Sequence, residues 1–149
     1  MSPDDFESAV LGAFQYLISD FGFCYLSTRV HMPECWSTFH NQTTSVVVHY
    51  EAGSPPWVVL ARLEVIRDRT EVRDQAALAF LVHERSQNVS IPERPLNDED
   101  LRRMIDLNAR QLREYGEDVL RGDFRIFPRL EELAAENLRR RNASEPYSS

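Results

Sequence analysis

Residues 96–141 contain the feature that most restricts the fold, a long amphipathic helix followed by a corner and a second helix. At 100° per residue, the apolar side chains of the first helix fall on one narrow face and charged side chains fall opposite. The apolar face comprises Leu101, Met104, Ile105, Asn108, Leu112, Tyr115 and Val119. Because such a face has to be buried, we expect the upstream residues to supply the surface that it covers.

Local signals predict where the first of these helices begins and where the chain turns. Asn97 is a typical N-cap residue, and Leu96 and Leu101 have the spacing of a hydrophobic staple. Gly122 can adopt the left-handed conformation that ends a helix, and Asp123 can cap the turn that follows. These residues predict a helix from residue 97 and a corner at 121–124.

The final helix is expected to begin at Pro128, because proline has no N–H to donate and suits the first helical position. Its apolar side chains predict burial of Leu130, Leu133, Ala134 and Leu138. Residues 142–149 are predicted to be a disordered tail. We therefore expect one domain over residues 1–141, which is an ordinary domain length.

The upstream residues change from a helical period to a period of two. Ser2 as N-cap and Gly22 as terminator predict an N-terminal helix. The alternating residues after it predict four strands with short connections, which favour antiparallel neighbours. These strands are expected near Phe23–Val30, Trp36–His40, Ser45–Glu51 and Trp57–Val65.

The last two predicted strands divide their side chains between two faces. One face is expected to be apolar and to carry Val46, Val48, Tyr50, Trp57, Val59, Ala61 and Leu63. The other is expected to carry Val47, His49, Glu51, Val58, Leu60, Arg62 and Glu64. Alanines in residues 70–84 predict a short helix docked on the sheet. The predicted fold is therefore α+β: a helix, an antiparallel meander of about four strands, a short helix and a C-terminal helical hairpin packed on the sheet.

Composition excludes several kinds of function. The net charge of −7 disfavours nucleic acid as a ligand and favours a basic partner. All 17 basic residues are arginine, which excludes Schiff-base and P-loop lysine chemistry. No window reaches the roughly 20 apolar residues of a membrane span, and the acidic N-terminus does not resemble a secretory signal. We expect a cytoplasmic protein.

The cysteines and histidines of the sheet region are the residues most suited to chemistry. They are Cys24, His31, Cys35, His40 and His49. Thiolates and imidazoles ligate zinc, but no Cys-x-x-Cys spacing occurs, so we expect no metal and no cofactor. A Cys–His nucleophile pair stays open as an alternative, whereas a disulfide between the two cysteines is disfavoured in a reducing cytoplasm.

Three further residues carry expectations about burial. Trp36 and Trp57 begin strands, and we expect core positions for them rather than interface anchors. Asn108 is the one polar residue in the middle of the helical apolar face, so it needs a partner such as a strand-end carbonyl or Tyr115.

Residues 115–130 read Tyr-Gly-Glu-Asp-Val-Leu-Arg-Gly-Asp-Phe-Arg-Ile-Phe-Pro-Arg-Leu. This segment resembles the ending of many small bacterial proteins, some of them immunity proteins of polymorphic toxin systems. The order of helix, meander and closing helices is also similar to theirs along most of the chain. The resemblance implies a small, non-enzymatic, cytoplasmic protein that binds and neutralises a toxin. The resemblance assigns no functional residue to this chain.

Two surfaces are candidates for binding a protein partner, possible targets being basic toxin domains. One is the second predicted sheet face, which mixes apolar and polar side chains and carries His49, Glu51, Arg62 and Glu64. The other is the acidic helix face around Glu114, Glu117 and Asp118. Two other classes stay open. One is a ligand- or metal-binding protein or enzyme that uses the Cys/His group, and the other is a self-associating adaptor. Either a monomer or a homodimer is compatible with the sequence.

Overall fold

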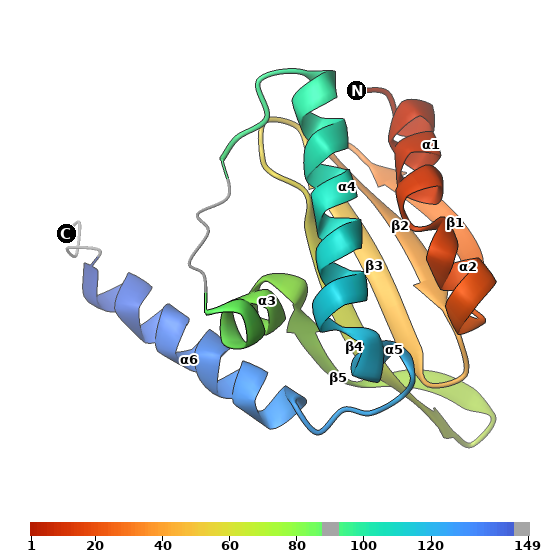
Figure 1. Cartoon of the computed structure of the whole chain (residues 1–149), viewed down its shortest axis with the longest axis vertical. Coiled ribbons are helices and arrows are strands. Elements are labelled where there is room, and N and C mark those ends of the chain that lie inside the picture. The colour runs from red at the N-terminus through yellow and green to blue at the C-terminus, as the bar shows by residue number, and fades with distance from the viewer. Residues whose placement is uncertain (88–92, 145–149) are drawn as a thin grey trace.

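The computed structural model describes residues 1–87 and 93–144 as one antiparallel sheet with helices packed on it (Figure 1). Each strand pairs with its neighbours in sequence, in the order β1-β2-β3-β4-β5. The strands are β1 Cys24–His31, β2 Glu34–His40, β3 Thr44–Glu51, β4 Trp57–Ile66 and β5 Arg69–Ala77. The predicted α+β class is confirmed, with five strands instead of four.

The fifth strand corrects the prediction of a helix over residues 70–84. Arg69–Ala77 is strand β5, and the helix α3 covers only Leu78–Ser86. Arg67 and Asp68 both have positive φ, 52° and 63°, which is the geometry of a two-residue hairpin turn between β4 and β5. The hairpin pairs β5 with β4 over eight residue pairs, so strand pairing overrides the helical preference of the alanines.

The predicted N-terminal helix is present as two segments, α1 Pro3–Ala13 and α2 Gln15–Phe21. Ser2 Oγ accepts a hydrogen bond from the Asp5 N–H at 3.1 Å, which confirms the predicted cap. Gly22 ends α2 with φ 69°, as its position predicts. Figure 1 shows α1 and α2 in front of the sheet, on the same side as α4.

Helix α4, Asp98–Tyr115, is the long amphipathic helix that the sequence predicts. Asn97 Oδ1 accepts a hydrogen bond from the Asp100 N–H at 2.8 Å, so the cap is confirmed. The expected staple is wrong, because Leu96 is 89% exposed and cannot shield Leu101. The Asn108 amide donates to the Pro56 carbonyl at 3.4 Å, the strand-end partner that its position in the apolar face requires.

The corner after α4 docks on the turn between β2 and β3. It begins with the short helix α5, Glu117–Leu120. Asn41 Nδ2 donates to the Leu120 carbonyl at 3.3 Å, and Thr44 Oγ1 donates to the Val119 carbonyl at 3.1 Å. Gly122 has φ 91°, which confirms the predicted left-handed residue.

Helix α6, Phe127–Ser144, begins one residue before Pro128 and runs past the predicted end of the domain. Leu130 and Leu133 are buried as predicted, but Ala134 and Leu138 are exposed. Figure 1 gives the reason, because α6 (blue) passes α3 and then extends away from the rest of the molecule. Residues 142–144 of the predicted tail are helical, and residues 145–149 lie outside the described residues.

The core lies between the sheet and the helices, with contributions from every helix. Its largest fully buried side chains are Phe6, Phe14, Leu17, Phe39, Leu60, Leu81, Leu101, Ile105, Leu112, Leu120 and Leu130. Across residues 1–87 and 93–144, no helix has the length and apolar character needed to cross a membrane. The predicted connection over residues 86–95 falls partly on 88–92, which are outside the described residues.

Candidate functional site

The face of the sheet turned away from the core, here called the open face, is the candidate site. The strand register pairs Val46 with Leu60 and Val48 with Val58, and all four are buried on the helix side. The expected assignment of the β4 side chains to the two faces of the sheet is therefore wrong, because the register differs from the expected one by one residue. A slip of one residue moves every side chain to the other face.

Three aromatic side chains stand side by side on the open face and form a group that we call the aromatic row: Trp36, His49 and Trp57. The register places them directly opposite one another on β2, β3 and β4. The ring centroids of His49 and Trp57 are 4.9 Å apart with an interplanar angle of 3°. Those of Trp36 and His49 are 6.1 Å apart with an angle of 25°.

The two tryptophans are not core residues, which corrects the expectation from the sequence. Trp57 is 37% exposed and Trp36 is half-buried, because the register directs both side chains away from the helices. Strand β5 ends at Ala77, opposite Val59, so no strand lies beside Trp57 on that side. One side of this indole is therefore accessible to a partner.

The middle ring of the row is uncharged at neutral pH. Burial between its neighbours lowers the pKa of His49 from its ordinary value of 6.5, and this effect outweighs the charge of Glu34, which raises it. The row therefore presents three neutral aromatic rings to solvent. Stacked and offset arrangements at these separations are favourable for aromatic side chains.

Two carboxylates, here called the acid pair, lie next to the aromatic row on the open face. Glu34 on β2 is directly opposite Glu51 on β3, and each is two residues from a member of the row. Within residues 1–87 and 93–144, neither carboxylate forms an ion pair. Like charges directly opposite in a sheet are destabilising, so the fold retains an unfavourable pair here.

The four sheet residues predicted to bind a partner do not share one surface. His49 and Glu51 lie on the open face, whereas Arg62 lies on the helix side with its guanidinium 5.8 Å from the Phe124 ring centroid. Glu64 lies farther along β4, 3.7 Å from Arg73 Nε. The structure brings together only the first two, and it adds Trp36, Trp57 and Glu34 to them.

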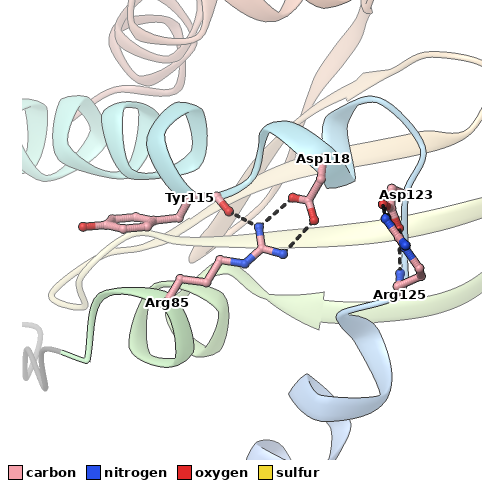
Figure 2. A network of polar contacts seen from close by, with 5 residues as sticks. All are labelled: Arg85, Tyr115, Asp118, Asp123 and Arg125. Carbon is pink, nitrogen blue, oxygen red and sulfur yellow. Dashed lines mark hydrogen bonds and ion pairs between the residues drawn. The ribbon is translucent and has the colours of Figure 1, made fainter.

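Two of the three acids predicted on the helix face already have internal partners. Asp118 accepts two hydrogen bonds of 2.6 Å from Arg85 (Figure 2). Glu117 lies 3.0 Å from Arg121. The hydrogen bonds from Arg85 lower the pKa of Asp118, so its charge is stabilised by the chain itself. In the described part of the chain, only Glu114 of the three has no ion pair.

The cysteines and histidines do not assemble into a metal site. Cys24 is exposed opposite His40, whereas Cys35 is buried opposite Val30 at the other end of the strands, so a disulfide between them is not possible. Burial raises the pKa of the Cys35 thiol, which disfavours the thiolate needed for attack or ligation. Among residues 1–87 and 93–144, no three side chains of metal-binding type come together.

No protein-family model, no curated protein and no solved structure matches this chain. The open face is therefore located by the geometry of this chain and not by comparison with a known site.

Proposed function

We propose that this chain is a non-enzymatic binding protein that holds a protein partner on the open face of its sheet. From the resemblance of residues 115–130, we infer that the partner is a bacterial toxin domain, neutralised in the cytoplasm by direct binding. The observation that carries the proposal is the aromatic row, which places two indole rings on the sheet face away from the core. Tryptophan is enriched among residues that dominate protein–protein binding.

The charge of the molecule favours a basic partner. The net charge is −7, and the acid pair Glu34 and Glu51 adds a local negative potential beside the aromatic row. Complementary charge speeds association and excludes partners of the wrong sign. A second copy of the chain is a poorer occupant of the open face, because it would bring the same acid pairs into one interface.

The open face is preferred to the acidic helix face for two reasons. Asp118 and Glu117 on the helix face are neutralised by arginines of the same chain. The open face instead combines unpaired carboxylates with large, partly exposed rings. Buried aromatic contacts surrounded by polar residues are the usual composition of an interface centre and its rim.

The test begins with capture of the partner. The tagged chain is incubated with lysate of its source bacterium at low and at moderate salt, and the recovered protein is identified and purified. Its affinity is then measured by calorimetry for the wild-type chain, for W36A/W57A and for the control E114R/E117R. We expect the tryptophan variant to lose at least about 30-fold in affinity, the effect of one hot spot of about 2 kcal/mol, and the control to bind normally.

Neutralisation is tested separately in cells. The recovered protein should stop growth when it is expressed alone, and the wild-type chain, but not W36A/W57A, should restore growth. A partner that loses affinity only for E114R/E117R would reject the open face. A recovered protein without toxicity would reject the immunity function and leave a simple adaptor.

A further inference from the structure

We propose that the open face receives a basic segment of its partner, with one arginine guanidinium placed against the carboxylates of Glu34 and Glu51 and beside the rings of the aromatic row. This inference deepens the proposed function and rests on it, because it assigns the chemistry that the partner must present. Three features of the open face favour a guanidinium there: the position of the carboxylates, the unoccupied indole rings and the neutrality of His49.

Within the described residues, the acid pair has no ion-pair partner. In an antiparallel pair, directly opposite side chains have Cβ atoms about 4.5–5.5 Å apart, so the charges of Glu34 and Glu51 repel each other. His31 lies directly opposite Glu34, and Arg29 is the nearest arginine by register, opposite Trp36. Neither forms an ion pair within residues 1–87 and 93–144. A cation from a partner would relieve this repulsion.

The rings lie within reach of the same cation. Residues two apart in a strand point to the same face and are separated by roughly 7 Å, so Glu34 lies beside Trp36 and Glu51 lies beside His49. The charge of Glu34 already acts on the His49 ring. Because that ring is neutral, the row contains no charge that would repel an incoming cation.

The indole rings are also unoccupied. Over the described residues, three arginines lie above aromatic rings, at 5.8 Å for Phe124, 5.1 Å for Tyr16 and 5.1 Å for Phe21, and none lies above a tryptophan. Tryptophan is the strongest cation–π acceptor. The chain therefore uses its own arginines on weaker acceptors and leaves the two stronger ones on the open face for a partner.

Guanidinium fits this surface better than an ammonium group. Its planar fork can donate to carboxylate oxygens while its flat face stacks on an aromatic ring. Glu34 and Trp36 lie two residues apart on the same face of β2, so a planar group held by the carboxylates lies next to the Trp36 ring. We therefore expect arginine rather than lysine as the recognised residue.

The chain carries its own optical probe for this test. It contains only two tryptophans, Trp36 and Trp57, and both belong to the aromatic row. Tryptophan fluorescence and the indole N–H signals in NMR spectra therefore report on the open face alone. The probe compounds are N-acetyl-arginine methylamide and its uncharged analogue, N-acetyl-citrulline methylamide.

Titration of the full chain with the arginine compound should produce saturable changes of both indole signals, and these should weaken as salt increases. The citrulline compound should produce none. The variant E34Q/E51Q should lose at least about tenfold in arginine affinity, equivalent to one charge-assisted contact. The control E99Q/E114Q removes the same charge from α4 and should bind like the wild-type chain.

Thermal unfolding gives a second measurement that does not depend on binding. Because the glutamine substitutions remove the repulsion between Glu34 and Glu51, E34Q/E51Q should unfold at a higher temperature than the wild-type chain. Equal responses to arginine and citrulline, an equal response to N-acetyl-lysine methylamide, or a lower unfolding temperature of E34Q/E51Q would overturn the inference. If a captured partner binds the open face but arginine does not, the proposed function survives and only this inference fails.

Discussion

Arg85 and Asp118 form a bidentate ion pair that joins α3 to α5. Both guanidinium-to-carboxylate distances are 2.6 Å, and Arg85 Nη1 also donates to the Tyr115 carbonyl at the end of α4 (Figure 2). The same view shows Arg125 bound to Asp123, whose pKa falls to about 2 through hydrogen bonds from Arg125. The Arg85 guanidinium on α3 thus contacts both α4, through Tyr115, and α5, through Asp118.

The substitution Asp118→Asn should lower the free energy of unfolding by about 1 kcal/mol at neutral pH. The value is modest because about a third of the pair is exposed and solvent screens it. Arg85 lowers the pKa of Asp118, so the stabilisation is present above the ordinary value of 3.8 and is lost as pH falls through the pKa of the folded chain. Urea unfolding should therefore show that wild type and variant converge in strong acid.

Glu131→Gln on α6 is the control for that experiment, because it removes an exposed charge that has no ion pair in the described part of the chain. It should change stability by less than about 0.5 kcal/mol. An Asp118→Asn effect that stays constant from neutral to acid pH would contradict the assignment to this ion pair.

Two aliphatic residues of α4 lie on different faces of the helix, one in the core and one at the solvent. Ile105 is 0% exposed, and Leu107 is 43% exposed. Ile105→Ala should lower the free energy of unfolding by about 2–5 kcal/mol because it leaves a cavity. Leu107→Ala should cost less than about 1 kcal/mol, and chemical denaturation measures both. Equal costs would mean that the burial pattern of α4 is incorrect.

Two glycines give opposite expectations for the same substitution. Gly122 has φ +91°, and an added Cβ would lie 3.0 Å from Thr43 Oγ1, so Gly122→Ala should cost about 1–2 kcal/mol. Gly12 lies in α1 with open space around it, so Gly12→Ala should stabilise the chain by about 0.5–1 kcal/mol. Thermal unfolding of the two variants tests these expectations. A higher unfolding temperature of Gly122→Ala would exclude the left-handed geometry of Gly122 at the corner.

His49 should titrate below 6.5 in the folded chain, because burial between the indoles disfavours its charged form. The unfolded chain then binds this proton more readily, so the contribution of His49 to stability falls as pH decreases through 6.5 and levels off below the folded pKa. NMR titration of the imidazole C–H signals measures the value. Trp57→Ala uncovers the ring and should raise the pKa back towards 6.5, whereas an unchanged pKa would assign the shift to another cause.

The sequence predicted those parts of the fold that depend on neighbouring residues. Ser2, Asn97 and Gly122 were identifiable because a cap involves backbone groups within a few positions of the residue itself. The buried face of α4 was also predictable from its period. Strand β5 was not, because its pairing with β4 depends on a hairpin turn at Arg67 and Asp68, which are residues without a glycine signal.

The candidate site was predicted only in part because it depends on register across three strands. His49 and Glu51 were identified from their charge and position, but the alternation within β4 was assigned to the wrong faces, and the tryptophans were placed in the core. The sequence contains one signal for where β4 begins. Pro55 and Pro56 have no N–H to donate, which marks Trp57 as the start of pairing on β4. Its partner, His49, depends on the length and geometry of the loop after Glu51, which the prolines do not give.

The sequential order of the strands has a consequence for synthesis of the chain from its N-terminus. Strands β1 to β5 can pair as soon as residue 77 has emerged, because each strand needs only its immediate neighbour. At that time α1 and α2 are available to cover β1 and β2, but α3 and α4 are still unmade. The nascent sheet therefore exposes the inner sides of β3 and β4 together with the aromatic row. This is the stage at which the growing chain most needs protection from other unfinished chains.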